Sequence, residues 1–177
     1  MYKRQAYAKS YIYIPGTLTK APGFFPKGQE EEKYREFRET CEKADGELVT
    51  LYNGMCKEDP DKAKIFSAHR ELLQDEEILD EIREAICAES MNPDSAVSKV
   101  YTEFAELLAG VEDPLIAERA ADLRDVRDRL LRILSGQETS KLSSFSEDVI
   151  LVAHDLLPSD TAVSYTHLRA HETLMNL

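Results

Sequence analysis

The chain has 177 residues, enough for one ordinary domain with a core or for one domain and part of another. Its 34 acidic and 22 basic residues give a formal net charge of −12, which argues against nucleic acid as a partner, because neutralising phosphates requires a basic surface. No apolar run approaches the roughly 20 residues of a membrane-spanning helix and no secretory signal is visible, so we expect a cytoplasmic protein that does not bind membranes.

Both ends of the chain differ from the rest. Residues 1–5 and residues 163–177, the latter with SYTHLRAHET, are typical of translated cloning or sequencing adapters. Such segments are set aside before a fold is predicted. The native stretch is then expected to run from about residue 6 to residue 162, cut at both ends.

The first predicted element is a short strand at residues 10–14, SYIYI, which is rich in β-branched and aromatic side chains. Prolines and glycines punctuate the chain from there to Gly28, which indicates a connection. Residues 6–28 are therefore assigned to a strand and linker, and a helical domain is predicted over residues 29–145.

From Gln29 the apolar residues are spaced alternately by three and four, which predicts a long helix with a heptad seam. The seam consists of Tyr34, Phe37, Cys41, Ala44, Leu48, Leu51 and Met55. It favours packing along a partner helix, as an antiparallel hairpin or a coiled coil. A purely structural role is the preferred interpretation of this helix.

Residues 64–79, KIFSAHRELLQDEEIL, are the most informative stretch for function. They predict a helical face that is apolar apart from one imidazole. The residues on this face are Ile65, Phe66, His69, Leu72 and Leu73. Asp75 can then cap a further helix with Glu76 and Glu77 in its first turn. A broken helix pair with carboxylates at the break suits the binding of a basic partner.

Three other helices are predicted to begin with a side-chain cap followed by proline. These starts are Asp59-Pro60, Asn92-Pro93 and Asp113-Pro114. Five helical segments with short connections then form an all-α unit of helical hairpins.

Residues 148–153, DVILVA, form a continuous apolar run, which is typical of a strand buried on both faces. The order of strand, helical block and strand indicates that the helical unit is inserted into an α/β domain. The expected fold class is therefore mainly α: a bundle of antiparallel helical hairpins inserted into a truncated α/β domain with two short strands. Residues 146–162 are assigned to the truncated α/β part.

Three blocks of the sequence together resemble the amino-terminal half of Enzyme I, the phosphoenolpyruvate-protein phosphotransferase of the bacterial sugar phosphotransferase system. They are KIFSAHRELLQDEEI at 64–78, AERAADLRDVRDRLLRIL at 117–134 and EDVILVAHDLLPSDTA at 147–162. The resemblance covers about residues 10–162. It implies a helical subdomain that docks the small phosphocarrier HPr, inserted into an α/β subdomain that carries the phosphorylated histidine.

The resemblance places the HPr-docking surface around the helix break and at the start of the last helix. Its residues here are His69, Leu72, Asp75, Glu76, Glu77, Ile78, Leu115, Ile116 and Arg119. Glu71 stands where an apolar residue is usual in the family, so we expect a smaller apolar part. Residues 58–89 hold 11 acidic and 4 basic side chains, a local net charge of −7 that would steer a basic partner. The alternative is a solvated acidic face over ordinary core leucines.

No catalytic residue is predicted in this chain. His69 is interpreted as an interface residue, because a lone histidine on an apolar helix face is more often packed than catalytic. In the family the phosphate acceptor is a histidine in a Gly-Gly-x-Thr-Ser-His segment, expected beyond Leu157, which itself replaces a usual threonine. No such segment contains His154, His167 or His171. The chain as written is therefore expected to be inactive in phosphoryl transfer.

No metal or cofactor site is predicted either. Cys41, Cys56 and Cys87 lack the paired spacing of a disulfide framework or a zinc site, so we expect reduced thiols. The resemblance implies magnesium and phosphoenolpyruvate for the full-length family protein only. Their sites belong to a carboxy-terminal barrel, through which the full-length protein is expected to form a homodimer.

Three functional interpretations remain open. The chain is a fragment of Enzyme I that docks HPr, an Enzyme I-like region of a multi-module protein such as a dihydroxyacetone kinase subunit, or a non-enzymatic helical interaction module. A Gly-Gly-x-Thr-Ser-His segment in the native sequence after Ala162 would separate the first two from the third.

Overall fold

The computed structural model describes residues 9–13, 22–57, 59–136 and 149–153. The adapter-like ends lie outside these ranges, as do Leu157 and the three histidines His154, His167 and His171. The chain divides into two compact units. One is Gly16–Thr139, and the other combines Met1–Pro15 with Ser140–Leu177.

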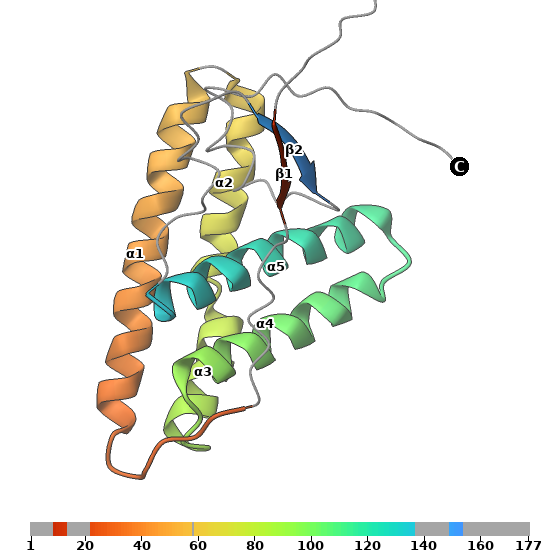
Figure 1. Ribbon diagram of the computed structural model, residues 1–177. Helices are drawn as coiled ribbons and strands as arrows, with labels where there is room; N and C mark the ends of the chain where they lie inside the picture. Colours follow the sequence, from red (N-terminus) through yellow and green to blue (C-terminus); the bar gives the residue numbers. More distant parts are fainter. Residues whose placement is uncertain (1–8, 14–21, 58, 137–148, 154–177) are drawn as a thin grey trace, which may run out of the picture. The chain divides into compact units, whose positions relative to one another are not determined.

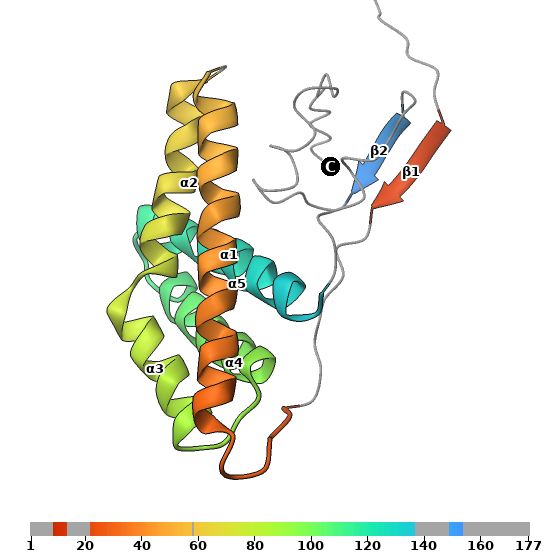
Figure 2. The ribbon, with the colours of Figure 1, turned by 90° about the vertical axis from the view of Figure 1, so that its left-hand side faces the viewer.

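The described part of the first unit contains five helices (Figures 1 and 2). They are α1 (Glu30–Cys56), α2 (Pro60–Leu73), α3 (Glu76–Cys87), α4 (Pro93–Ala109) and α5 (Pro114–Leu134). Helices α1 and α2 lie side by side and antiparallel, and α4 and α5 form a second hairpin. The predicted helical hairpins are therefore confirmed. None of the helices that the structure describes is long and apolar enough to cross a membrane.

The seam predicted on α1 lies at the core of this unit. Phe37, Ala44 and Leu48 are fully buried, and α1 packs against α2. Burying a large apolar side chain contributes roughly 1.5 to 3 kcal/mol, so the seam is a main source of stability. Burial also raises the pKa of the Cys41 thiol to about 12, which keeps it protonated and unreactive.

Aspartate side chains fix the starts of three helices. Asp59, Asp75 and Asp113 each accept hydrogen bonds from backbone N–H groups two or three residues further on, at distances of 2.9 to 3.2 Å. These bonds satisfy N–H groups that have no partner within the first helical turn. The caps predicted at these three positions are confirmed.

The cap predicted at Asn92 is wrong, although α4 does begin at Pro93. The Asn92 side chain makes no capping bond, and its backbone N–H donates to the Gly23 carbonyl at 2.8 Å. A Cβ on Gly23 would lie 2.6 Å from Nδ2 of Asn92, so any larger residue at this position would force the Asn92 side chain to move. The Phe25 N–H likewise donates to the Ser90 carbonyl at 2.9 Å, and the Phe25 ring is buried. The predicted connection is thus a packed part of the helical unit.

The second unit contains a parallel pair of strands, β1 (Lys9–Tyr13) and β2 (Val149–Ala153). Tyr11 lies opposite Leu151 in the register. Parallel strands need a long crossover, and here the chain between them includes the whole helical unit. The prediction that the two strands come together from opposite ends of the sequence is confirmed.

Candidate functional site

The helix break between α2 and α3 has the form that the sequence predicts. Asp75 has an extended backbone, and its carboxylate accepts from the N–H groups of Glu77 and Ile78 at 3.0 and 3.2 Å. Glu76 and Glu77 follow in the first turn and are exposed. The positive end of the helix dipole favours carboxylates there. The break therefore presents three acidic side chains. One of them, Asp75, also fixes the backbone there through its capping bonds.

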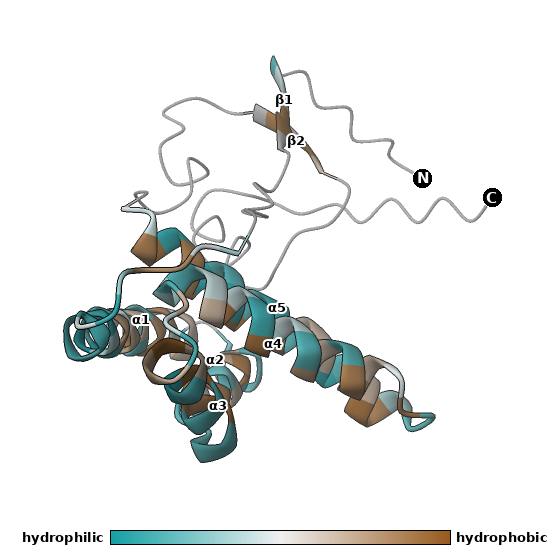
Figure 3. Ribbon diagram, turned by 90° about the horizontal axis from the view of Figure 1, so that it is seen from below, coloured by the Kyte–Doolittle hydropathy of each residue, from teal (hydrophilic) through white to brown (hydrophobic). Residues whose placement is uncertain are grey.

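A group of exposed apolar side chains surrounds the turn between α4 and α5. This apolar patch consists of Leu107, Val111, Leu115 and Ile116, which are 70, 36, 74 and 37% exposed. Figure 3 shows hydrophobic segments at this end of the hairpin. Grouped exposed apolar side chains of this kind make the turn a candidate binding site.

The sequence singled out Leu115 and Ile116 through the resemblance, but it missed Leu107 and Val111. Leu107 continues the helical spacing of buried residues in α4, so its spacing alone resembles that of a core residue. One sequence feature could have pointed to these two residues: both helices stay apolar up to the turn that joins them, where fewer neighbouring side chains can cover apolar residues.

The structure places two of the nine predicted docking residues inside the helical unit. His69 is fully buried and Ile78 is 2% exposed, so neither can contact a partner directly in this conformation. Leu72 is half-buried. The other six, Asp75, Glu76, Glu77, Leu115, Ile116 and Arg119, are exposed. The docking role of all nine stays a proposal, and for His69 and Ile78 it becomes an indirect one.

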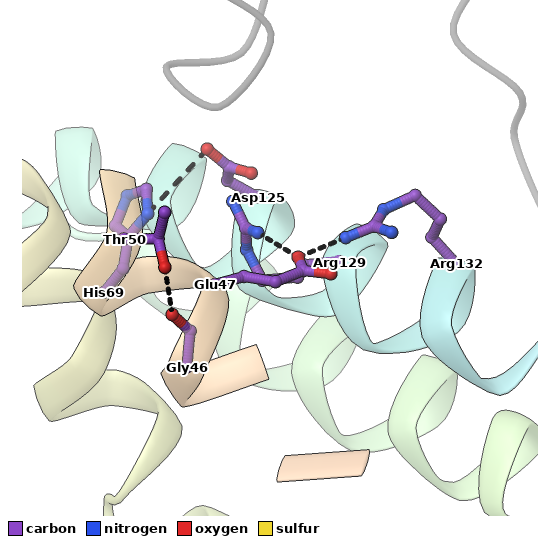
Figure 4. Close-up of polar contacts among 7 residues, drawn as sticks. All are labelled: Gly46, Glu47, Thr50, His69, Asp125, Arg129 and Arg132. Carbon is purple, nitrogen blue, oxygen red and sulfur yellow. Dashed lines mark hydrogen bonds and ion pairs between the residues drawn. The ribbon is translucent and has the colours of Figure 1, made fainter. Parts of the chain in front are cut away.

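His69 joins α2 to α5. Its Nε2 atom is 3.2 Å from Oδ1 of Asp122, and its Nδ1 atom is 3.8 Å from Oδ2 of Asp125 (Figure 4 shows the second contact). The rings of His69 and Phe66 are nearly perpendicular and pack edge to face. The imidazole is thus enclosed by an aromatic ring and two carboxylates, and it is inaccessible to a phosphoryl donor.

The end of α2 is also held from α1 and α4. Arg70 donates from Nε and Nη2 to the two oxygens of Asp45 at 2.6 and 3.2 Å, and this pairing raises the pKa of the Arg70 guanidinium. The Tyr101 hydroxyl donates to the Leu72 carbonyl at 3.4 Å, and burial raises the pKa of Tyr101. These contacts fix the position at which α2 stops and α3 begins.

Helix α5 is tied to α1 by a second group of charges. Glu47 accepts hydrogen bonds from both Arg129 and Arg132, as Figure 4 shows. Within the described ranges, no cluster of three or more histidine, cysteine or acidic residues has the geometry of a metal site. The Glu47 contacts fix α5 against α1.

Comparison with known proteins identifies the family. Residues 5–119 match the family model described as PEP-utilising enzyme, N-terminal. The chain belongs to this family. It is 38% identical over 133 residues to the phosphoenolpyruvate-protein phosphotransferase of Bacillus subtilis (strain 168), which is 75% of this chain and 23% of that protein. It is 35% identical over 162 residues to the Staphylococcus aureus (strain MRSA252) protein of the same name, which is 89% of this chain and 27% of the relative.

The chain thus spans about a quarter of the length of these PEP-utilising relatives. A solution structure of Enzyme I matches with a TM-score of 0.74 and 33% identity, over 88% of this chain and 63% of that one. The N-terminal domain of Enzyme 1 - Nitrogen matches with a TM-score of 0.68 and 24% identity, a likeness that supports the fold alone. The resemblance to the N-terminal part of Enzyme I and the predicted fold class are confirmed.

Substituting Asp75 separates its capping role from its charge. We expect Asp75→Ala to lower the free energy of unfolding by about 1 kcal/mol, because two N–H groups of α3 lose their acceptor. Asp75→Asn removes the same charge but keeps an acceptor oxygen, so its effect should be much smaller. Urea denaturation followed by circular dichroism measures both, and equal losses for the two variants would contradict the cap.

Proposed function

We propose that the chain is the HPr-docking part of a phosphoenolpyruvate-protein phosphotransferase. The observation that supports this most directly is the exposed apolar patch on a helical unit of this family. A lone exposed leucine needs no explanation, but four apolar side chains around one turn do. A partner that covers them would gain the free energy of burying each one.

The acidic helix break supplies the second part of the proposed surface. Asp75, Glu76 and Glu77 lie at the start of α3, within the stretch whose local net charge is −7. Charge of one sign accelerates encounter with an oppositely charged partner, whereas buried apolar contacts lengthen the life of the complex. We therefore assign association chiefly to the carboxylates and the lifetime of the complex to the apolar residues.

Ile78 has an indirect role in this proposed surface. Its side chain is buried while the preceding two glutamates are exposed, so it anchors the first turn of α3 to the core. Leu72 is half-buried at the other side of the break and contributes its exposed part. Arg119 adds one exposed cation on α5, which gives the proposed surface a directional charge pattern.

For the full-length parent we propose the activity named for the relatives, with phosphoenolpyruvate and magnesium in a part of the protein outside this chain. Homodimerisation through that part belongs to the same proposal. The chain itself is proposed to bind HPr without relaying phosphate. The support is that His69 is enclosed and that the sequence has no Gly-Gly-x-Thr-Ser-His segment.

Charge reversal tests the acidic part of the surface. The double variant Glu76→Lys and Glu77→Lys should slow association with HPr by roughly tenfold and reduce its dependence on salt, because steering by these charges is lost. Stopped-flow mixing at two ionic strengths measures both effects. Glu31→Lys with Glu32→Lys, in the exposed first turn of α1, changes the net charge equally and is the matched control. Equal slowing by both double variants would mean that only the overall charge matters.

Truncating Leu115 tests the apolar part. Leu115→Ala should raise the rate of HPr dissociation by roughly tenfold, because a side chain buried in the complex is lost. The free energy of unfolding should change little, since the side chain is exposed in the free protein. Phe24→Ala removes another exposed apolar side chain and should leave dissociation unchanged. Unchanged dissociation in Leu115→Ala would remove this residue from the site.

Intact-mass spectrometry tests the absence of phosphoryl relay. After mixing the chain with phosphoenolpyruvate, magnesium and HPr, we expect no acid-labile phosphoryl adduct on the chain, because catalysis by a nucleophile requires a positioned and accessible imidazole. An intact phosphoenolpyruvate-protein phosphotransferase treated in parallel is the positive control. An adduct on any residue of this chain would contradict the proposal.

A further inference from the structure

One carboxylate of α1 binds two side chains at the end of α2. Oδ1 of Asp45 accepts hydrogen bonds from Nε of Arg70 at 2.6 Å and from Nε2 of Gln74 at 3.3 Å. Its Oδ2 atom accepts from Nη2 of Arg70 at 3.2 Å. Arg70 lies about one helical turn before Gln74, which is the residue at which α2 ends. Asp45 therefore attaches the end of α2 to α1 at two points.

The joint between α2 and α3 consists of two residues whose backbone is not helical. Gln74 has φ −105° and ψ 5°, and Asp75 has φ −62° and ψ 122°. The capping bonds of Asp75 act within the first turn of α3 and fix that turn alone. Asp45 holds the first residue of the joint from another helix. The direction in which the acidic break points therefore depends on this attachment.

The form of the contact decides whether it can fix the joint. The side chains of Asp45 and Arg70 are 30 and 41% exposed, and a single ion pair with such exposure usually stabilises a protein little. This pair is bidentate, and Gln74 adds a third donor. Bidentate geometry restricts orientation as well as distance. On the α4 side, the Tyr101 hydroxyl donates one long hydrogen bond of 3.4 Å to the Leu72 carbonyl, so Asp45 makes the more restrictive attachment.

We propose that Asp45 is a positioning residue of the docking surface: without contacting HPr, it holds the end of α2 so that residues on both sides of the joint meet one partner. The inference rests on the proposed docking function. Leu72 precedes the joint, and Glu76 and Glu77 follow it. HPr then binds only conformations in which the joint is held, and the apparent dissociation constant rises as their fraction falls.

An effect of charge alone makes the opposite prediction for one half of the pair. Asp45→Asn removes a carboxylate and Arg70→Gln removes a cation, so their effects on binding a basic partner would have opposite signs. A positioning role predicts weaker binding by both variants, because each breaks the same attachment. The double variant keeps the net charge of the unaltered chain. It should bind as weakly as the single variants, since one attachment can be lost only once.

The test is the dissociation constant for HPr, measured by isothermal titration calorimetry with the full chain at low and high salt. High salt screens steering between exposed charges and leaves the effect of positioning. At high salt we expect Asp45→Asn, Arg70→Gln and the double variant each to bind roughly threefold more weakly than the unaltered chain. Circular dichroism should show unchanged helical content in all three.

Hydrogen exchange reports on the attachment without HPr. The Gln74 amide donates to backbone carbonyls of the last turn of α2, and the Ile78 amide donates to the capping carboxylate of α3. Both amides should exchange faster in all three variants, because the joint opens more often. The amide of Leu48, in the buried seam of α1, should exchange at an unchanged rate. Equal acceleration at all three amides would show a loss of overall stability and would overturn the positioning role.

Lys99 and Glu89 form the matched control pair. Nζ of Lys99 on α4 lies 3.3 Å from the carboxylate of Glu89, which follows the far end of α3 from the break. Their side chains are 40 and 46% exposed, close to the values of the tested pair. Lys99→Gln, Glu89→Gln and their double variant should leave HPr binding at high salt unchanged.

The two proposals fail in different ways. If the unaltered chain does not bind HPr at either salt concentration, the docking function is overturned. If it binds, and the double variant of Asp45 and Arg70 binds equally tightly at high salt, the positioning role is overturned. Weaker binding by Asp45→Asn together with tighter binding by Arg70→Gln would show an effect of charge alone, which also overturns the inference.

Discussion

The buried face of α1 is the constraint on which the rest of the helical unit depends. Every other helix of the described unit packs against α1, and its seam from Phe37 to Met55 offers one continuous apolar surface for them. Interiors are packed as densely as organic crystals, so a helix that lies against such a seam has little freedom to slide. The ion pairs of Asp45 with Arg70 and of Glu47 with Arg129 then fix the rotation of α2 and α5 on this support.

This arrangement explains how a small unit can present two different chemistries. The carboxylates lie where a helix stops and a new one starts, and their placement is set by local backbone geometry and one capping side chain. The apolar patch lies where two helices reach beyond the support of α1, so their last side chains lack a neighbour. A rigid interior with such ends needs little reorganisation to bind, which reduces the entropic cost of association.

Local chemistry made most of the fold predictable. The caps at Asp59, Asp75 and Asp113 depend on atoms two or three residues away, and the α1 seam depends on helical spacing. Asn92 could not be predicted, because Gly23, far away in the sequence, occupies its surroundings. The same limit applies to the site: helical spacing places His69 on an apolar face but does not say whether that face is covered by a partner or by α5. Only the fold brings Asp122 and Asp125 to the ring.

The parallel pairing of β1 with β2 has a consequence for the order of folding during synthesis. β1 leaves the ribosome before the helical unit, and β2, with which it pairs, is made after that unit. The helical hairpins form local contacts, which assemble quickly, whereas the strand pair must close a loop that spans the entire unit. The unit is therefore expected to fold while β1 is still an unpaired edge. During that interval the exposed Ile12 side chain would be a point of contact for chaperones or for other nascent chains.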